Sequence, residues 1–285
     1  MKEDQPLDRV LRGIHPELSW NAIRRAIRTG KVFVNGALVR EPTARVNPES
    51  EIRLVPTAPR PASHPRIELL HVDRDVVVVR KPAGVSTVPY EGESTSLMAL
   101  VRDVVANKHG RSAALGVVQR LDKETTGVLV FARNVTAKRH LQQQFRKRSI
   151  ERRYLALARG KVARSTFRSR LVPDRGDGRS GSTRHPKLGR EAVTHVEVVE
   201  RLRGATLVAC RLETGRRHQI RIHLAEAGHP LLGERVYAPK IPQQAPRLML
   251  HAARLGFDHP RTGRRMIFEE PMPDDMRALV EALRE

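Results

Sequence analysis

Short runs of apolar and β-branched residues recur along residues 66–285, and each run is typical of a buried strand. They read DVVVVRKP, GVLVFAR, RYLALARG, VTHVEVVERL and ATLVACRLE. Other segments have helical spacing instead, among them STSLMALVRDVVANK, TAKRHLQQQFRKR and DDMRALVEALRE. Because strands outnumber helices and many strands are neighbours in sequence, we expect an α+β fold around a mixed or antiparallel sheet.

The first 55 residues show a different pattern, in which two helical segments precede short strands. The segments LDRVLRGI and SWNAIRRAIRTG both have helical spacing. In the second, Ser19 is expected to cap the N-terminus of a helix, and Trp20, Ile23 and Ile27 form an apolar stripe. Gly30 is expected to end this helix.

A hairpin is expected directly after that helix. The segment VFVNGALV places two apolar runs around Asn35-Gly36, which is a strong hairpin signal, and EIRLV adds another strand. The helix and the residue after it carry four cations, Arg24, Arg25, Arg28 and Lys31. A basic helix followed by a hairpin makes a compact surface for binding a polyanion. The alternative is a solvated helix face without a ligand.

Two stretches lack periodicity. Residues 56–65, PTAPRPASHP, contain four prolines and favour an extended, semi-rigid connector. We therefore expect a small domain at residues 1–55, a linker at 56–65 and a larger domain at 66–285. Residues 173–190, PDRGDGRSGSTRHPKLGR, predict a mobile basic loop, which either orders on RNA or is an insertion.

The charge of the chain narrows the choice of partners. Among 285 residues, 53 Lys and Arg oppose 31 Asp and Glu, giving a formal net charge of +22. This excess is far beyond what solubility needs and predicts a polyanionic partner, most plausibly nucleic acid. An anionic membrane is the alternative, but the sequence has neither a stretch as long as a transmembrane helix nor a lipidation motif.

The sequence also predicts a cytoplasmic protein. The first ten residues, MKEDQPLDRV, contain no apolar signal-peptide core. Cys210 is the single cysteine, so neither an intramolecular disulfide nor a cysteine-rich zinc site can form. Its position in the apolar run ATLVAC predicts a buried core residue. The histidines at 218, 223 and 229 match no common ligand spacing, so no metal site is expected.

One motif places charge where a core is expected. In QRLDKETTG (residues 119–127), Arg120, Asp122, Lys123 and Glu124 immediately precede the apolar run VLVF. Charged groups beside a core need partners or a function.

This motif and three others resemble the RluA-type family of pseudouridine synthases. The family hallmark is His-Arg-Leu-Asp, two variable residues, then Thr-Ser-Gly, and residues 119–127 follow it. The segments ERRYLAL (151–157), LETGRRHQIRIHLAEAGHPLLGERVY (212–237) and RLMLHAARLGFDHP (247–260) occur in the family's order, after its opening ELLHVDRDVVVVRKPAGVSTVP. The resemblance implies isomerisation of uridine in RNA, in which the base detaches from ribose, rotates and rejoins through carbon 5. Such a reaction needs no cofactor and no metal.

The first 55 residues, from PLDRVLRGI to ESEIRL, resemble an S-four-type RNA-binding domain. This second resemblance implies that the basic helix and the loop after it contact RNA phosphates. It gives the cations at 24, 25, 28 and 31 a role that charge alone leaves open.

The resemblance also implies catalytic roles for three residues. Asp122 takes the place of the family's catalytic aspartate, which acts as a nucleophile, stabilises positive charge on the sugar, or moves a proton from carbon 5. Arg221 pairs with it and keeps it ionised. Read as a strand, RHQIRIH directs Arg221 to one face and Ile220 and Ile222 to the core. Tyr154 would stack on the extracted uracil.

Two further residues are expected to contact RNA. Arg120 matches the arginine that helps displace the target base from its helix, and Lys123 faces RNA beside it. The motif departs from the family at two positions, because Gln119 replaces the usual His and Thr126 replaces the usual Ser.

These observations together predict a monomeric RNA pseudouridine synthase without an obligate protein partner. Large-subunit ribosomal RNA is the expected substrate, and transfer RNA is the second choice. The rival hypothesis is a noncatalytic RNA-binding or ribosome-assembly factor, which explains the charge and the N-terminal domain equally well. That hypothesis does not explain why Asp122, Tyr154 and Arg221 occur in matching motifs.

Overall fold

The computed structural model describes residues 4–39, 41–58, 67–89, 95–109, 114–240 and 245–284. The chain forms two compact units, Met1–Arg66 and Ile67–Glu285. Residues 59–65 of the expected linker lie outside the described residues. No helix within the described ranges is both long and apolar enough to cross a bilayer.

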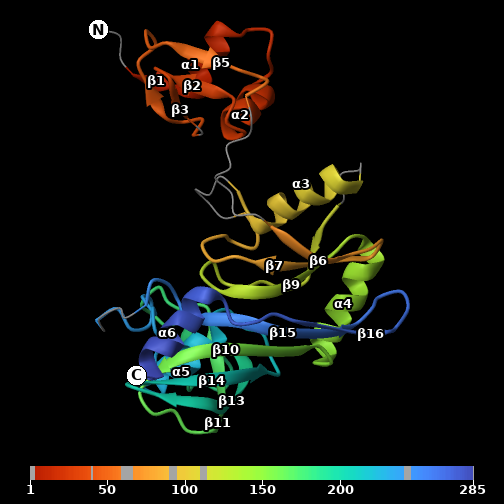
Figure 1. Cartoon of the computed structure of the whole chain (residues 1–285), viewed down its shortest axis with the longest axis vertical. Coiled ribbons are helices and arrows are strands. Elements are labelled where there is room, and N and C mark those ends of the chain that lie inside the picture. The colour runs from red at the N-terminus through yellow and green to blue at the C-terminus, as the bar shows by residue number, and fades with distance from the viewer. Residues whose placement is uncertain are drawn as a thin grey trace. The chain divides into compact units, whose positions relative to one another are not determined.

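The first unit packs two helices against short strands (Figure 1). Its elements are β1 (Gln5–Pro6), α1 (Leu7–Ile14), α2 (Trp20–Arg28), β2 (Val32–Val34), β3 (Ala37–Leu38), β4 (Arg45–Val46) and β5 (Ile52–Leu54). β2 lies between β3 and β5 in an antiparallel sheet, and β1 pairs with β4. Ile23 and Ile27 of α2 are fully buried with Leu7 and Leu11 of α1, and strand residues such as Val32 complete this core.

Local signals in this unit were mostly confirmed. The Ser19 hydroxyl accepts a hydrogen bond from the Ala22 amide and caps α2. Asn35 and Gly36 both have positive φ, as a tight hairpin turn requires. The expectation that Trp20 belongs to the apolar stripe is wrong. Trp20 opens the helix, is 44% exposed, and lies beneath the Arg24 guanidinium at 5.5 Å.

The second unit is built on one large mixed sheet. Its strands are β6 (Glu68–Val72), β7 (Val76–Lys81), β8 (Gly116–Val117), β9 (Thr126–Ala132), β10 (Glu151–Arg159), β11 (Ser165–Val172), β12 (Gly181–Thr183), β13 (Arg190–Leu202), β14 (Ala205–Leu212), β15 (Leu250–Asp258) and β16 (Arg265–Glu269). The main order is β12-β11-β13-β14-β10-β15-β9-β7-β6, with β16 on β15 and β8 on β9. Within the described residues β15 and β9 are parallel, and the other pairs are antiparallel. The expected α+β class is therefore confirmed.

Helices cover both faces of this sheet. They are α3 (Leu97–His109), α4 (Val135–Lys147), α5 (Gln219–Glu226) and α6 (Asp274–Arg284). The alternation within β7 separates the two faces: Val77 and Val79 join the cluster that contains α3 and α5 residues, whereas Val76 and Val78 join the cluster that contains α4 residues. The expected helices around 97–109, 135–147 and 274–284 are confirmed.

The stretch 173–190 contains more regular structure than its composition predicted. Gly181–Thr183 form β12 and pair with β11. The Asp174 carboxylate accepts hydrogen bonds from the amides of Gly176 and Gly178, which folds the turn before β12. Local side-chain-to-backbone bonds of this kind order a glycine-rich segment without any hydrophobic periodicity.

A polar network ties the turn before β7 to the turn after β15. The Asp73 carboxylate contacts His71 Nε2 at 2.7 Å and His259 Nε2 at 3.0 Å. Arg261 donates two hydrogen bonds to Asp75. Ligand atoms of Asp73, Asp75 and His259 lie close enough together to hold a metal ion. His259 Nδ1 accepts hydrogen bonds from the amides of Arg261 and Thr262, so the ring proton lies on Nε2. His259 Nε2 therefore donates to the Asp73 carboxylate. The arrangement is a hydrogen-bonded brace.

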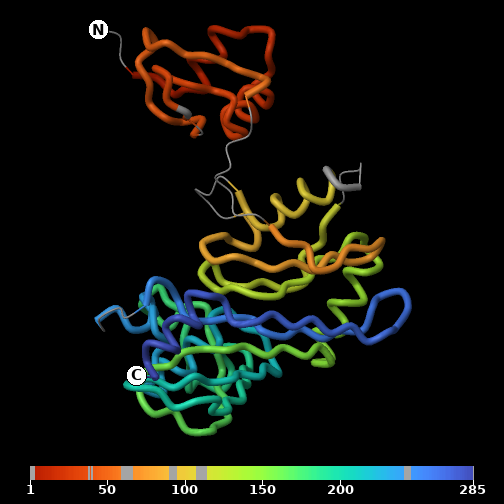
Figure 2. Tube along the Cα trace, viewed as in Figure 1, coloured from red at the N-terminus to blue at the C-terminus, as the bar shows by residue number. Residues whose placement is uncertain are grey.

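The parallel pairing of β9 with β15 fixes the position of the motif at residues 119–127. In Figure 2 the yellow-green β9 runs beside the blue β15, although the two strands are far apart in sequence. Gly127 has φ 114°, and a Cβ atom on it would lie 2.2 Å from the Ala252 carbonyl oxygen. Only glycine permits this approach of the two backbones.

Gly127→Ala is expected to destabilise the second unit by about 3 kcal/mol or more, because the added methyl group overlaps a central backbone. Gly204→Ala is the matched control, since Gly204 also has a positive φ but no atom within 4 Å of the added Cβ. The control should lose only about 1–2 kcal/mol. Thermal unfolding followed by circular dichroism measures both, and equal losses would contradict the steric argument.

The brace predicts an acid-sensitive contribution to stability. Burial raises the pKa of Asp73, but hydrogen bonds from His71 and the backbone outweigh it and lower the pKa from 3.8 to about 2. Since the folded pKa is depressed, this stability is present above pH 3.8 and is lost as pH falls towards about 2. Asp73→Asn should lower the melting temperature at neutral pH and flatten its decline over that window. The exposed Asp274→Asn serves as the control, and an unchanged slope in Asp73→Asn would refute the assignment.

Candidate active site

The loop that carries Asp122 is held by a buried cation. Lys81, at the end of β7, has no exposed surface, and its ammonium donates to the carbonyl oxygens of Lys123 and Thr125 at 2.8 Å and of Pro82 at 3.0 Å. Burying an ammonium is costly unless its donors are satisfied. Lys81 therefore fixes the backbone on the C-terminal side of Asp122.

A second residue fixes the other side of the loop. The Thr87 hydroxyl donates to the Leu121 carbonyl at 2.8 Å and accepts from the Leu121 amide at 3.1 Å. The Leu121 side chain is buried in the core cluster. Asp122 therefore lies between two anchored residues, as a carboxylate with a defined direction requires.

The Asp122 carboxylate contacts Arg221, as expected from the sequence. Arg221 Nη1 lies 3.1 Å from Asp122 Oδ2. The same guanidinium is held from behind by Glu234, through Nε to Oε2 at 2.7 Å and Nη2 to Oε1 at 2.8 Å. Exposure of the side chains rises along this chain of contacts, from 0% for Glu234 to 9% for Arg221 and 24% for Asp122. The catalytic candidate is thus the outermost member.

The electrostatics keep the inner pair ionised. Burial lowers the pKa of Arg221, but the hydrogen bonds and charges of Glu234 and Asp122 outweigh it and raise that pKa. Burial raises the pKa of Glu234, and Arg221 outweighs this effect so that the pKa is lowered. The amides of Val236 and Tyr237 also donate to Glu234 Oε1. Arg221 therefore presents a permanent, oriented positive charge to Asp122.

The expectation that Arg221 lies on a strand is wrong. Residues Gln219–Glu226 form α5, whose residues up to Leu224 are all buried. Ile220 and Leu224, four residues apart, pack in the core, whereas Ile222 packs in a separate small cluster. Because apolar residues line more than one side of this short helix, its sequence lacks the polar face that normally reveals helical periodicity. Arg221 is in the first turn of α5 and reaches Asp122 from there.

Besides Glu234, two residues that the sequence did not assign to the site, His218 and Tyr237, complete it. His218, which precedes α5, has φ 56°, and its Nε2 lies 3.8 Å from Asp122 Oδ2. Its Nδ1 lies 2.7 Å from the Tyr237 hydroxyl oxygen, and the Tyr237 ring packs 5.4 Å from the Arg221 guanidinium. Burial lowers the pKa of His218 despite the charge of Asp122, and burial raises the pKa of Tyr237. The helical spacing between positions 218 and 221 would have indicated this convergence had α5 been predicted.

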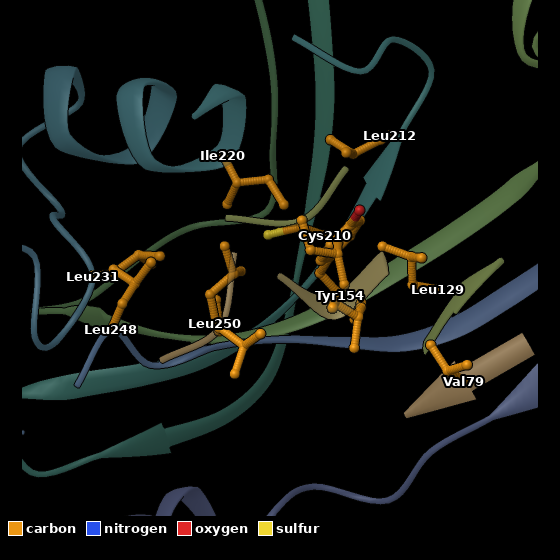
Figure 3. Close-up of a cluster of buried hydrophobic side chains, with 14 of the residues drawn as sticks. Val79, Leu129, Tyr154, Cys210, Leu212, Ile220, Leu231, Leu248 and Leu250 are labelled. Atoms are coloured by element: carbon orange, nitrogen blue, oxygen red, sulfur yellow. The ribbon is translucent and has the colours of Figure 1, made fainter. Parts of the chain in front are cut away.

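Tyr154 lies beside the site but is largely in the core. Figure 3 shows its ring among Cys210, Leu129 and Ile220, and 8% of the residue is exposed. Burial raises the pKa of its hydroxyl, and Asp122 adds to this effect. Only a small part of Tyr154 is thus available to a ligand. Cys210 is fully buried, as expected, and burial raises the pKa of its thiol to about 12.

The remaining residues of the motif differ in their surroundings. Arg120 is exposed and has no hydrogen bond or ion pair with any described residue, and Lys123 is also exposed. The Gln119 side-chain nitrogen is buried without a hydrogen-bond partner among the described residues. Thr126 bonds His251 Nδ1 through its hydroxyl at 2.9 Å, a contact that serine could also make.

The four cations predicted for the first unit fall into two groups. Arg25 and Arg28 on α2 are exposed and unpaired within the described residues. Arg24 instead pairs with the buried Asp8 at 2.7 Å, and Lys31 donates to the Ala58 carbonyl. Arg24 and Lys31 therefore contribute to the unit's own structure.

Comparison with known proteins agrees with this geometry. The family model described as RNA pseudouridylate synthase matches residues 75–226. The Bacillus subtilis protein named uncharacterized RNA pseudouridine synthase YlyB is 34% identical, over 99% of this chain and 95% of its own length. The ribosomal large subunit pseudouridine synthases D of Pasteurella multocida and Zymomonas mobilis are 35% and 36% identical, over 98% and 97% of this chain and 91% and 93% of theirs.

Solved structures agree on the fold. Human RNA Pseudouridylate Synthase Domain Containing 4 superposes with a TM-score of 0.63 at 24% identity, covering 76% of this chain and 93% of its own. Human RNA Pseudouridylate Synthase Domain Containing 1 gives 0.60 at 22% identity, covering 77% and 95%. The expected fold and family are confirmed: the chain belongs to the RNA pseudouridylate synthases, isomerases that convert uridine in RNA to pseudouridine.

Proposed function

We propose that this chain isomerises uridine in large-subunit ribosomal RNA, with Asp122 as the catalytic carboxylate. The observation that carries the proposal is the Arg221–Asp122 contact at 3.1 Å, backed by the buried Glu234. The names of the Pasteurella and Zymomonas relatives support ribosomal RNA as the substrate. Transfer RNA is the second candidate for the same chemistry.

Asp122 acts on the nucleotide at the bond between the base and the sugar. Its carboxylate attacks as a nucleophile or stabilises positive charge on the anomeric carbon, as carboxylates do in glycoside cleavage. Arg221 keeps the carboxylate ionised and directed. Tyr154 contacts the extracted uracil, and stacking on an aromatic ring contributes about 1–3 kcal/mol per base.

Arg120 and Lys123 bind the RNA beside the target. Extracting a base from its stack costs a few kcal/mol, and a long planar cation such as Arg120 fills the space that the base leaves. The exposure of Arg120 and its lack of a partner among the described residues support this role.

The first 55 residues act as an S-four-type RNA-binding domain joined to the catalytic domain at 66–285 by the linker at 56–65. Cations exposed on α2 support this assignment. The proposed contact surface includes Arg24 and Lys31 beside Arg25 and Arg28, and these two cations also make contacts within the unit, with Asp8 and the Ala58 carbonyl. The protein works as a monomer in the cytoplasm without an obligate protein partner.

Asp122→Asn tests the catalytic assignment. Pseudouridine is mapped after the purified full chain is incubated with unmodified ribosomal and transfer RNA, without added metal or cofactor. The wild type should form pseudouridine in ribosomal RNA, and the variant should be slower by about 10³-fold or more, a loss of at least about 4 kcal/mol of transition-state stabilisation. Both proteins should bind RNA equally.

Glu124→Gln, in the same loop, is the control and should keep wild-type activity. A variant Asp122→Asn that matches the wild type would remove Asp122 from the mechanism. A wild type that binds these RNAs but modifies none of them would return the chain to the hypothesis of a noncatalytic assembly factor. Modification of transfer RNA alone would change the substrate and leave the chemistry intact.

The N-terminal domain is tested through the salt dependence of binding. Each phosphate contact that Arg25→Gln and Arg28→Gln remove should lower the slope of log affinity against log salt by about 0.7–0.9. The double variant should therefore weaken binding most at low salt. Arg53→Gln is the matched control, because Arg53 is an exposed cation of the same unit already paired with Glu51. Equal slopes for the double variant and the wild type would contradict the assignment.

A further inference from the structure

The two oxygens of the Asp122 carboxylate have different surroundings. Two nitrogen-bearing neighbours approach Oδ2, with Arg221 Nη1 at 3.1 Å and His218 Nε2 at 3.8 Å. No described residue forms a hydrogen bond with Oδ1. A carboxylate held through one oxygen retains a second oxygen with its electron pairs available to a ligand.

The surroundings of His218 determine which of its nitrogens carries the proton. Burial lowers its pKa, so the ring is neutral near pH 7 and has one N–H group. Burial also raises the pKa of Tyr237, whose hydroxyl therefore keeps its proton. An N–H group directed at Asp122 is favourable, whereas a lone pair directed at the carboxylate is repulsive. The proton therefore lies on Nε2, and Nδ1 accepts from the Tyr237 hydroxyl at 2.7 Å.

The Glu234 carboxylate, which holds Arg221, also positions His218 through Tyr237. Glu234 accepts from the amide of Tyr237, and the Tyr237 hydroxyl contacts His218. The backbone of His218 is left-handed at φ 56°, a conformation that costs a non-glycine residue about 1–3 kcal/mol. Such strain occurs where the surrounding structure requires a particular side-chain direction.

We propose that His218 is a second positioning residue for Asp122: its Nε2–H joins Arg221 at Oδ2, so that Oδ1 is the oxygen that reacts. The proposal rests on the proposed catalytic role of Asp122. The gap of 3.8 Å is too long for a hydrogen bond in the RNA-free protein. Contacts of this kind shorten when substrate closes the site.

Two amide substitutions separate the two ring nitrogens. In His218→Asn the amide replaces Nδ1 and nothing reaches Asp122, whereas in His218→Gln the amide replaces Nε2 and can still donate to Oδ2. Neither amide titrates. Asparagine tolerates the left-handed backbone better than most residues, so a slow His218→Asn variant cannot be attributed to backbone strain.

Steady-state kinetics on unmodified transcripts of the RNA that the wild type modifies should distinguish the variants. His218→Asn should lower kcat about 10- to 100-fold, as expected for losing a hydrogen bond to a charged group, with KM unchanged within about twofold. His218→Gln should stay within about fivefold of wild type. Equal impairment of both variants would overturn the proposal in favour of proton transfer by the imidazole. Wild-type rates in both would show that His218 has no role in the reaction.

His229→Asn is the matched control. His229 is also partly buried and contacts a backbone carbonyl through Nδ1, at 3.0 Å from Arg159, but it is outside the network around Asp122. Its kcat should remain within about twofold of wild type. If kcat of His229→Asn fell as far as kcat of His218→Asn, the His218 effects would reflect general perturbation of the fold.

The tautomer provides a test that does not depend on activity. Long-range ¹H–¹⁵N spectra of the RNA-free protein, assigned by the signals missing in His218→Asn, should show the proton on Nε2. Tyr237→Phe keeps the ring beside Arg221 and removes the hydroxyl, so the Nε2–H population should fall. A proton on Nδ1 in the wild type would overturn the proposal. A wild type that modifies no RNA would refute the proposed function and leave this spectroscopic result standing.

Discussion

The buried contact between Arg221 and Glu234 is the interaction on which the site depends. Removing one partner of such a pair costs about 3–5 kcal/mol, because the remaining charge is left in a poorly solvated place. Here the pair also has a directional consequence. Glu234 binds Nε and Nη2, and this leaves Nη1 to reach Asp122. The orientation of the catalytic candidate is therefore set from within the core.

The scaffold brings together segments that are distant in sequence. Lys81 at the end of β7 fixes the loop after Asp122, Gly127 allows β9 to approach β15, and Arg221 enters from α5. Each of these elements is anchored by burial. Among the charged residues before the strand at 128–131, Asp122 is held in direction by this convergence. The buried strand β9 gives the loop a rigid support, and the loop carries the proposed catalytic carboxylate of Asp122.

Sequence patterns predicted the parts that depend on local physics. Runs of β-branched residues predicted buried strands such as β7 and β9. Residue type alone predicted the helix cap at Ser19 and the hairpin turn at Asn35-Gly36. The short helix α5 was predicted as a strand because it is buried on nearly all sides, and its sequence therefore lacks the polar face of a surface helix. Glu234 and Tyr237 could not be identified from spacing, since their roles arise only when the segment after α5 folds back onto Arg221.

The graded exposure of Glu234, Arg221 and Asp122 suits the proposed reaction, in which a base is first extracted from RNA. A deeply buried aspartate would be unreachable, and a fully solvated one would have neither fixed direction nor strong interaction with its arginine. The Arg221–Glu234 pair that orients Asp122 is already formed in the RNA-free protein. In this proposal, contacts between RNA and the basic surface provide the free energy for extracting the base from its stack. The preformed site then acts on the extracted base.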